Sequence, residues 1–197
     1  MGLLDDIIKG AAEAVNAVKN TIKEGENQIS STDNADFDTP PEALPPISVE
    51  ANLNNRKVTF MISQDFIEDG GYESSVISLK YKPNGFHHYE DNCTISLHEG
   101  PGDFEEINEC IQEYISNGSV SGVDNFTELN NDKYLFKAKM DASDYVEYFY
   151  VLRDKAIDTD EYNILLLFYP NDIKNTMLEK KLISCLDDVA NSLTFLN

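Results

Sequence analysis

The amino-acid sequence predicts an α+β fold: an antiparallel sheet of about six or seven strands packed by two helices, with a separate N-terminal amphipathic helix on a linker. Three observations predict it. Apolar and polar residues alternate at a period of two through much of residues 47–197, as in half-buried strands. Two later segments change to helical periodicity, and the resulting order β-β-β-β-α-β-β-β-α favours an antiparallel sheet over a parallel one, in which strands and helices would alternate. The composition changes abruptly at residues 24–46, which separate the first 23 residues from the rest of the chain.

Residues 1–23 are predicted to form a marginal amphipathic helix. The apolar positions recur at three- and four-residue steps, and these candidate interaction residues are Leu4, Ile7, Ile8, Ala11, Val15, Val18 and Ile22. The stripe is narrow and rich in alanine, so the helix needs a surface to dock on, which can be its own domain, another copy, another protein or lipid. Another protein or self-association is favoured, because acidic residues offset the lysines and leave no cationic face for lipid.

Residues 24–46 are predicted to be a disordered linker rich in Pro, Asn and Asp. Their two proline pairs favour extended conformations near the end of this segment. The compact α+β domain is predicted to follow, over residues 47–197.

Seven strands are predicted in this domain from the period-two pattern. The segment 163–169 is apolar on both faces, as expected of a covered central strand. The segment 145–152 carries apolar or aromatic residues on both faces, and a covered second face is favoured there over an exposed aromatic patch for a partner. The seven predicted strands are 47–53, 58–62, 77–81, 93–97, 134–140, 145–152 and 163–169.

Two helices are predicted against the sheet. The first begins at Asp103, with Glu106 at capping-box spacing, and ends at Gly118. The second runs from Asp172 to Leu193, and its predicted apolar side is formed by Ile173, Met177, Ile183, Leu186, Ala190 and Leu193.

This order of elements, with a terminal helix that closes in Ala-Asn-Ser-Leu-Thr-Phe at 190–195, resembles the Mog1/PsbP-like superfamily, which includes bacterial domains of the DcrB type. The resemblance covers about residues 47–197. The segment from Lys57 to Ser63 continues into Gln64, Asp65 and Phe66, which keeps an aromatic residue that members often have there. The resemblance implies a binding or accessory role, such as chaperoning or assembly.

Composition limits the partners. The chain has 36 acidic and 15 basic residues, a net charge of −21, and its basic residues are interleaved with acids, so no nucleic-acid partner is expected. The longest apolar run, Ile164 to Tyr169, is too short to cross a bilayer, so no transmembrane segment is expected. The three cysteines lack metal or redox spacing and indicate buried thiols in a reducing, cytoplasmic compartment.

No residue pattern specifies a reaction, and no cofactor or metal is expected. The run His87 to Asp91 is interpreted as a polar hairpin loop, since neighbouring residues on an extended segment point in opposite directions. His98 is predicted on the polar, solvated face of its strand. The leading hypothesis is a non-catalytic protein-interaction domain. The alternative is a small-ligand-binding protein or enzyme whose polar pocket uses residues such as His87, His88, Tyr89 and Glu90.

Overall fold

The computed structural model describes residues 39–53, 56–68, 73–74, 76–82, 93–100, 109, 124–129, 133–153 and 162–196. The predicted N-terminal helix at residues 1–23 lies outside the described residues, as does nearly all of the predicted helix from Asp103 to Gly118. The run His87 to Asp91 also lies outside them.

A small sheet is built on the hairpin of β1 (Pro46–Leu53) and β2 (Arg56–Ser63). The two strands pair in continuous register, from Pro46 opposite Ser63 to Leu53 opposite Arg56. Strand β11 (Thr194–Leu196) pairs with β2, and β4 (Glu73–Ser74) pairs with the end of β1, which gives the order β11-β2-β1-β4. The alternation predicted for this hairpin is confirmed, since its buried apolar residues are Val49, Ala51, Leu53, Val58, Phe60 and Ile62.

A larger, fully antiparallel sheet has the order β3-β5-β6-β10-β9-β8-β7. Its strands are β3 (Phe66–Glu68), β5 (Val76–Tyr81), β6 (Thr94–Glu99), β7 (Asp124–Glu128), β8 (Tyr134–Asp141), β9 (Tyr145–Arg153) and β10 (Tyr162–Pro170). The prediction that 163–169 is a covered central strand is confirmed, because β10 lies between β6 and β9 with almost every side chain buried. On β9, Tyr150 and Val151 point to opposite faces and both are buried, so an exposed aromatic patch is not found there.

The structure therefore divides the single predicted sheet into two. Alternation along the sequence shows that a segment is a strand but not which strand it pairs with. The segments predicted at 58–62 and 77–81 do not pair with each other: β2 pairs with β1 and β11, whereas β5 pairs with β3 and β6. Strands β3, β4, β7 and β11 were not predicted, and all are five residues or shorter.

Helix α3 (Met177–Ser192) begins five residues later than predicted. The preceding residues Asn171–Ile173 form the 3-10 turn η2, and Asn175 adopts a positive φ of 67°, a conformation that interrupts a right-handed helix. Thr176 is the N-cap, and its hydroxyl accepts a hydrogen bond from the Glu179 N–H.

The buried side of α3 is also rotated from the predicted one. Met177 is 48% exposed and Ile183 is only partly buried, whereas Leu186, Ala190 and Leu193 are buried as predicted. The helix buries Leu178, Glu179, Leu182, Cys185, Leu186, Val189 and Ala190. These residues recur at three- and four-residue steps, so they form one continuous buried stripe along the helix.

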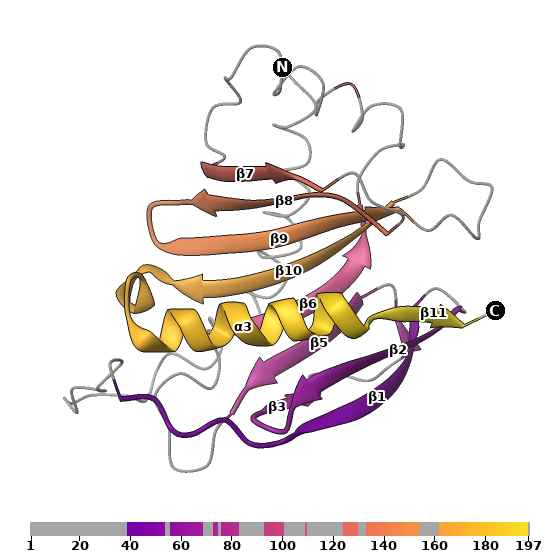
Figure 1. Cartoon of the computed structure of the whole chain (residues 1–197), viewed down its shortest axis with the longest axis horizontal. Helices are drawn as coiled ribbons and strands as arrows, with labels where there is room; N and C mark the ends of the chain where they lie inside the picture. The colour runs from indigo at the N-terminus through magenta and orange to yellow at the C-terminus, as the bar shows by residue number, and fades with distance from the viewer. Residues whose placement is uncertain are drawn as a thin grey trace.

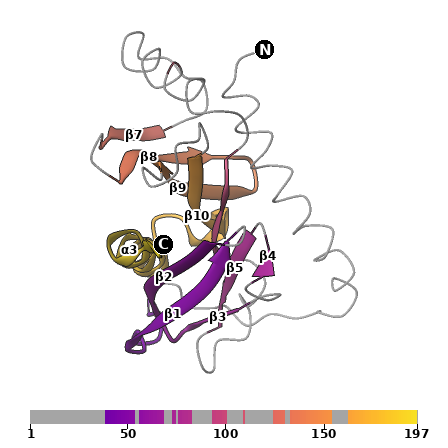
Figure 2. The same cartoon turned by 90° about the vertical axis from the view of Figure 1, so that its right-hand side faces the viewer.

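Helix α3 joins the two sheets by packing on β2 of the small sheet and β10 of the large one (Figure 1). Figure 2 shows α3 almost end-on, to one side of β2, β9 and β10. The main core cluster lies between these elements and includes Phe60, Leu97, Leu165 and Leu186. Among the described elements, the small sheet and β7 lie on opposite sides of α3 in Figure 1.

Candidate functional site

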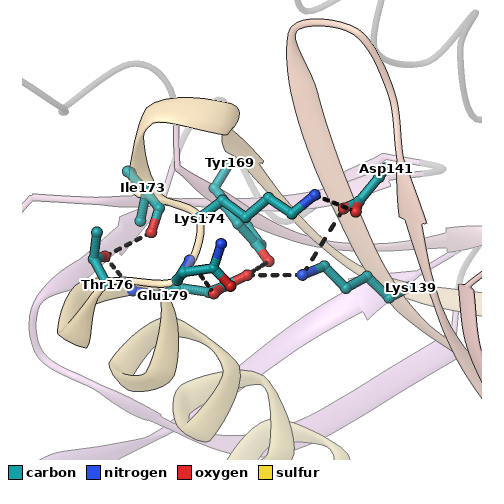
Figure 3. A network of polar contacts seen from close by, with 8 residues as sticks. Lys139, Asp141, Tyr169, Ile173, Lys174, Thr176 and Glu179 are labelled. Atoms are coloured by element: carbon teal, nitrogen blue, oxygen red, sulfur yellow. Dashed lines mark hydrogen bonds and ion pairs between the residues drawn. The ribbon is translucent and has the colours of Figure 1, made fainter.

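A network of charged residues connects the start of α3 to β8 and β10 (Figure 3). Glu179 is its centre. Its Oε1 accepts hydrogen bonds from Tyr169 Oη and, at 3.0 Å, from Lys139 Nζ. Its Oε2 accepts one from the Asn175 N–H at 2.7 Å. Lys139 also lies 3.8 Å from Asp141 Oδ1.

The Glu179 network has the residue types of an acid–base site but the geometry of a structural one. Burial acts to raise the pKa of Glu179, but the hydrogen bonds from Tyr169, Lys139 and the Asn175 N–H outweigh it, and the pKa is lowered. Burial and the hydrogen bond to Glu179 raise the pKa of the Tyr169 phenol, so this proton is held. Each of these groups already has a partner within the network, which indicates that the network positions the start of α3.

A second buried ion pair joins the chain before β1 to α3. Lys181 Nζ lies 3.0 Å from Asp65 Oδ2 and donates to the Pro41 carbonyl at 2.8 Å. The same Asp65 oxygen accepts from the Leu44 N–H at 3.2 Å and from Ser63 Oγ at 3.1 Å. Pro41 and Leu44 belong to the segment predicted as linker, so the last residues of that segment contact the domain.

His98 does not occupy the solvated position predicted for it. It is only 6% exposed, its Nδ1 lies 2.9 Å from the Glu99 carbonyl, and its Nε2 has no hydrogen-bond partner among the described residues. Burial lowers its pKa, because the charged imidazolium would lose hydration. His98 and Cys93, the residue just before β6, are five residues apart on an extended segment and face opposite sides, so they cannot form a nucleophile–base pair.

Both described cysteines are buried, as the sequence predicted. Burial raises the pKa of the Cys93 thiol, and it raises that of Cys185 to about 11. Both are therefore thiols near neutral pH, and neither has the thiolate character of a catalytic cysteine.

One cavity lies in the core between the sheets and α3. Its volume is about 10 Å³, whereas small-molecule sites occupy several hundred Å³. It is lined entirely by apolar side chains: Phe60, Ile77, Leu79, Ile95, Leu97, Leu165 and Val189. This cavity is too small for a ligand.

The outer side of β1 carries backbone groups that no described strand pairs with. Gln64 donates its N–H to the Pro45 carbonyl at 3.3 Å, which fixes the odd-numbered residues of β1 as those bonded to β2. Met61, opposite Ser48, accordingly directs its N–H away from β1, and it donates to Ser192 Oγ at 2.8 Å. The N–H and C=O groups of Ser48 and Glu50 therefore point outward from the sheet.

Strand β4 pairs only with Asn52 and Leu53, so Pro46 to Ala51 have an open outer edge within the described part of the chain. We call these six residues the open β1 edge. Its surface is accessible, because Ile47 is 43% exposed and the Glu50 side chain is 58% exposed. Figure 1 shows β1 at the periphery of the molecule.

The other edges of the described sheets differ from this one. Strand β7 has a register shift between Asp124 and Thr127, which is a bulge that interrupts a regular edge. Strands β3, β4 and β11 offer two or three residues each. The open β1 edge is the longest regular one in the described ranges, and nothing in the sequence distinguished it from a paired strand.

The residues that the sequence predicted as sites stay predictions. The interaction residues from Leu4 to Ile22 and the alternative pocket around His87 to Glu90 lie outside the described residues. Among the residues that are described, no group of three metal-ligating side chains gathers, and no helix is long and apolar enough to span a membrane.

No family model matches this sequence, and no curated protein matches it either. Among solved structures, the chain is similar to the Saccharomyces cerevisiae Ran-binding protein Mog1p, with a TM-score of 0.47 and 11% identity over 76% of this chain and 95% of that one. It is also similar to a mutant of protein Mog1, with a TM-score of 0.49 and 11% identity over 77% and 96% of the two chains. This likeness to Mog1 structures is one of fold.

Proposed function

We propose that this protein is a non-catalytic binding domain that docks another protein at the open β1 edge. The single observation that carries the proposal is the row of outward backbone groups on Pro46 to Ala51, which no described strand pairs with. An unpaired row of N–H and C=O groups is a template for a further strand.

Two features favour use of this edge over a purely passive role. Natural proteins usually make edge strands short or bulged, which holds for β3, β4, β7 and β11 but not for β1. An aliphatic side chain, Ile47, is also exposed beside the edge, where a docked strand would cover it.

We propose the N-terminal helix as a second contact, on the evidence of the sequence. Its apolar stripe from Leu4 to Ile22 needs a surface, and a partner provides one. Thr39 is the first described residue and precedes β1 by seven residues, so the segment 24–38 would link the predicted helix to the chain shortly before the open β1 edge. Two weak contacts joined by a short tether raise each other's effective concentration.

Photo-crosslinking in living cells tests the docking site. The photoreactive residue p-benzoylphenylalanine replaces Ile47 in the full chain, and the matched control carries it in place of Met177, which is equally exposed but lies at the start of α3. We expect a discrete protein adduct from position 47 and none from 177. The adduct should disappear in a chain that also carries Ser48→Pro, which removes an outward N–H without breaking the ladder to β2. The same adducts from both positions, or adducts that survive Ser48→Pro, would refute the proposed site.

A further inference from the structure

We infer that the open β1 edge takes an extended segment of a partner in which basic residues alternate with apolar ones. This inference rests on the proposed function and adds the chemistry of the occupant. It follows from three properties of the edge: where its backbone groups point, which side chains flank them, and the charge around them.

The backbone restricts where hydrogen bonds can form. Ser48 and Glu50 each present one outward N–H and one outward C=O, whereas Pro46 presents a C=O alone. A docked strand therefore exchanges its hydrogen bonds mainly with Ser48 and Glu50. Two residues with paired donors and acceptors suit a short extended segment of about five to seven residues.

The side chains divide the two faces of such a segment. Glu50 points to the outer face of the small sheet, where its Oε1 accepts from Lys57 Nζ at 2.7 Å. Ile47 and Val49 lie on the opposite face, where Val49 is part of the core and Ile47 is exposed. Residues of a docked strand alternate between the same two faces, so one set lies beside Glu50 and the other beside Ile47.

The charge of Glu50 determines which residues are favoured beside it in the docked strand. A basic residue beside Glu50 forms a cross-strand pair, whereas an acidic one is repelled. The Lys57–Glu50 pair does not prevent this, because both side chains are more than half exposed and such a surface pair is weak. The net charge of −21 adds long-range attraction for a basic segment and disfavours a second copy of this chain.

Blocked seven-residue peptides test this inference with the full chain labelled with ¹⁵N. In one peptide valine alternates with lysine, and in the other valine alternates with glutamate. We expect the lysine peptide to shift and protect the amide signals of Ser48 and Glu50, and the glutamate peptide to bind at least about fivefold more weakly. Glu50→Lys should remove or reverse this preference. Glu128→Lys, which changes the net charge equally at an exposed residue of the distant strand β7, should keep it.

The backbone hydrogen bonds to the docked segment can be tested separately from its charge. Ser48→Pro should weaken the lysine peptide at least about tenfold, and thermal unfolding checks that this variant is folded. A further test leaves the protein unchanged and uses two N-methylated forms of the lysine peptide, each methylated at one of the two alternating sets of residues. The form methylated at the residues whose N–H groups face β1 should not bind, and the other form should bind as the parent peptide does.

The outcomes separate the two proposals. If N-methylation of one set abolishes binding but Glu50→Lys behaves like Glu128→Lys, the edge docks strands and the basic chemistry is wrong. If both methylated peptides bind as the parent does, or if the shifted amides lie away from β1, the open edge is not the docking site and the proposed function fails with it.

Discussion

Replacement of Lys181 by methionine should be one of the most destabilising single changes in α3. Methionine keeps most of the length of the side chain but removes the ammonium group. That group lies 3.0 Å from Asp65 Oδ2, donates to the Pro41 carbonyl at 2.8 Å, and lies 5.2 Å from the centre of the Tyr81 ring. The change therefore leaves the Asp65 carboxylate buried without its counter-charge.

The expected size follows from burial. The side chains of Asp65 and Lys181 are 2% and 11% exposed, so water cannot replace the lost partner. Breaking a buried ion pair by removing one member costs about 3–5 kcal/mol. The Leu44 N–H and Ser63 Oγ still donate to Asp65, which places the expected loss in the free energy of unfolding near the lower end, at about 3 kcal/mol.

Urea unfolding followed by far-UV circular dichroism measures this loss. The matched control is Lys180→Met on the exposed side of the same helix turn, which should change the free energy of unfolding by less than about 0.5 kcal/mol. Adding Asp65→Asn to Lys181→Met should restore part of the stability, because the uncompensated charge is gone. A loss for Lys181→Met no larger than that for Lys180→Met would refute this reasoning.

Thiol reagents at neutral pH should label native Cys93 and Cys185 slowly, because both are buried with raised thiol pKa values; rapid labelling of either would contradict a structural role. The pKa of His98 is lowered in the folded protein, so below about pH 6.5 the unfolded chain binds more protons than the folded one, and the free energy of unfolding should decrease as the pH is lowered. His98→Phe should flatten the plot of urea midpoint against pH, and an unchanged slope would contradict this. The lowered pKa of Glu179 gives stability that is present above about pH 4.3 and lost as pH falls through the folded value; Glu179→Gln should cost roughly 1–3 kcal/mol at neutral pH, and a cost near zero would count against the network. Removal of residues 1–38 should leave thermal unfolding nearly unchanged but weaken partner crosslinking from position 47; a truncated domain that unfolds would make the helix part of the core.

Local pattern predicted most of the long strands correctly. Val58, Phe60 and Ile62 are buried because a strand directs every second side chain to one face, whatever its partner is. The same reasoning explains the start of α3 only in part. Thr176 and Glu179 have capping-box spacing, but the helix was predicted to begin at Asp172, soon after Pro170 at the end of β10. The positive φ of Asn175 is a property of the folded chain.

The charged sites were less accessible to prediction. His98 alternates with apolar neighbours and so was placed on a polar face, but the second face of the large sheet is also covered at that point. Asp65 and Lys181 are more than a hundred residues apart in the sequence, and no periodicity connects them. Only packing brings them to 3.0 Å.

The sequence by itself determined which of the longer described segments are strands, that α3 is a helix, and that the thiols of Cys93 and Cys185 are buried, since these depend on side-chain type and short-range spacing. The tertiary structure alone decided how the described strands divide between two sheets, and so that none of them pairs with the outer side of β1 at Ser48 and Glu50. The physical reason is that strand pairing joins backbone groups distant in sequence, and every residue except proline carries the same N–H and C=O groups, so the side-chain pattern cannot specify which edge stays unpaired.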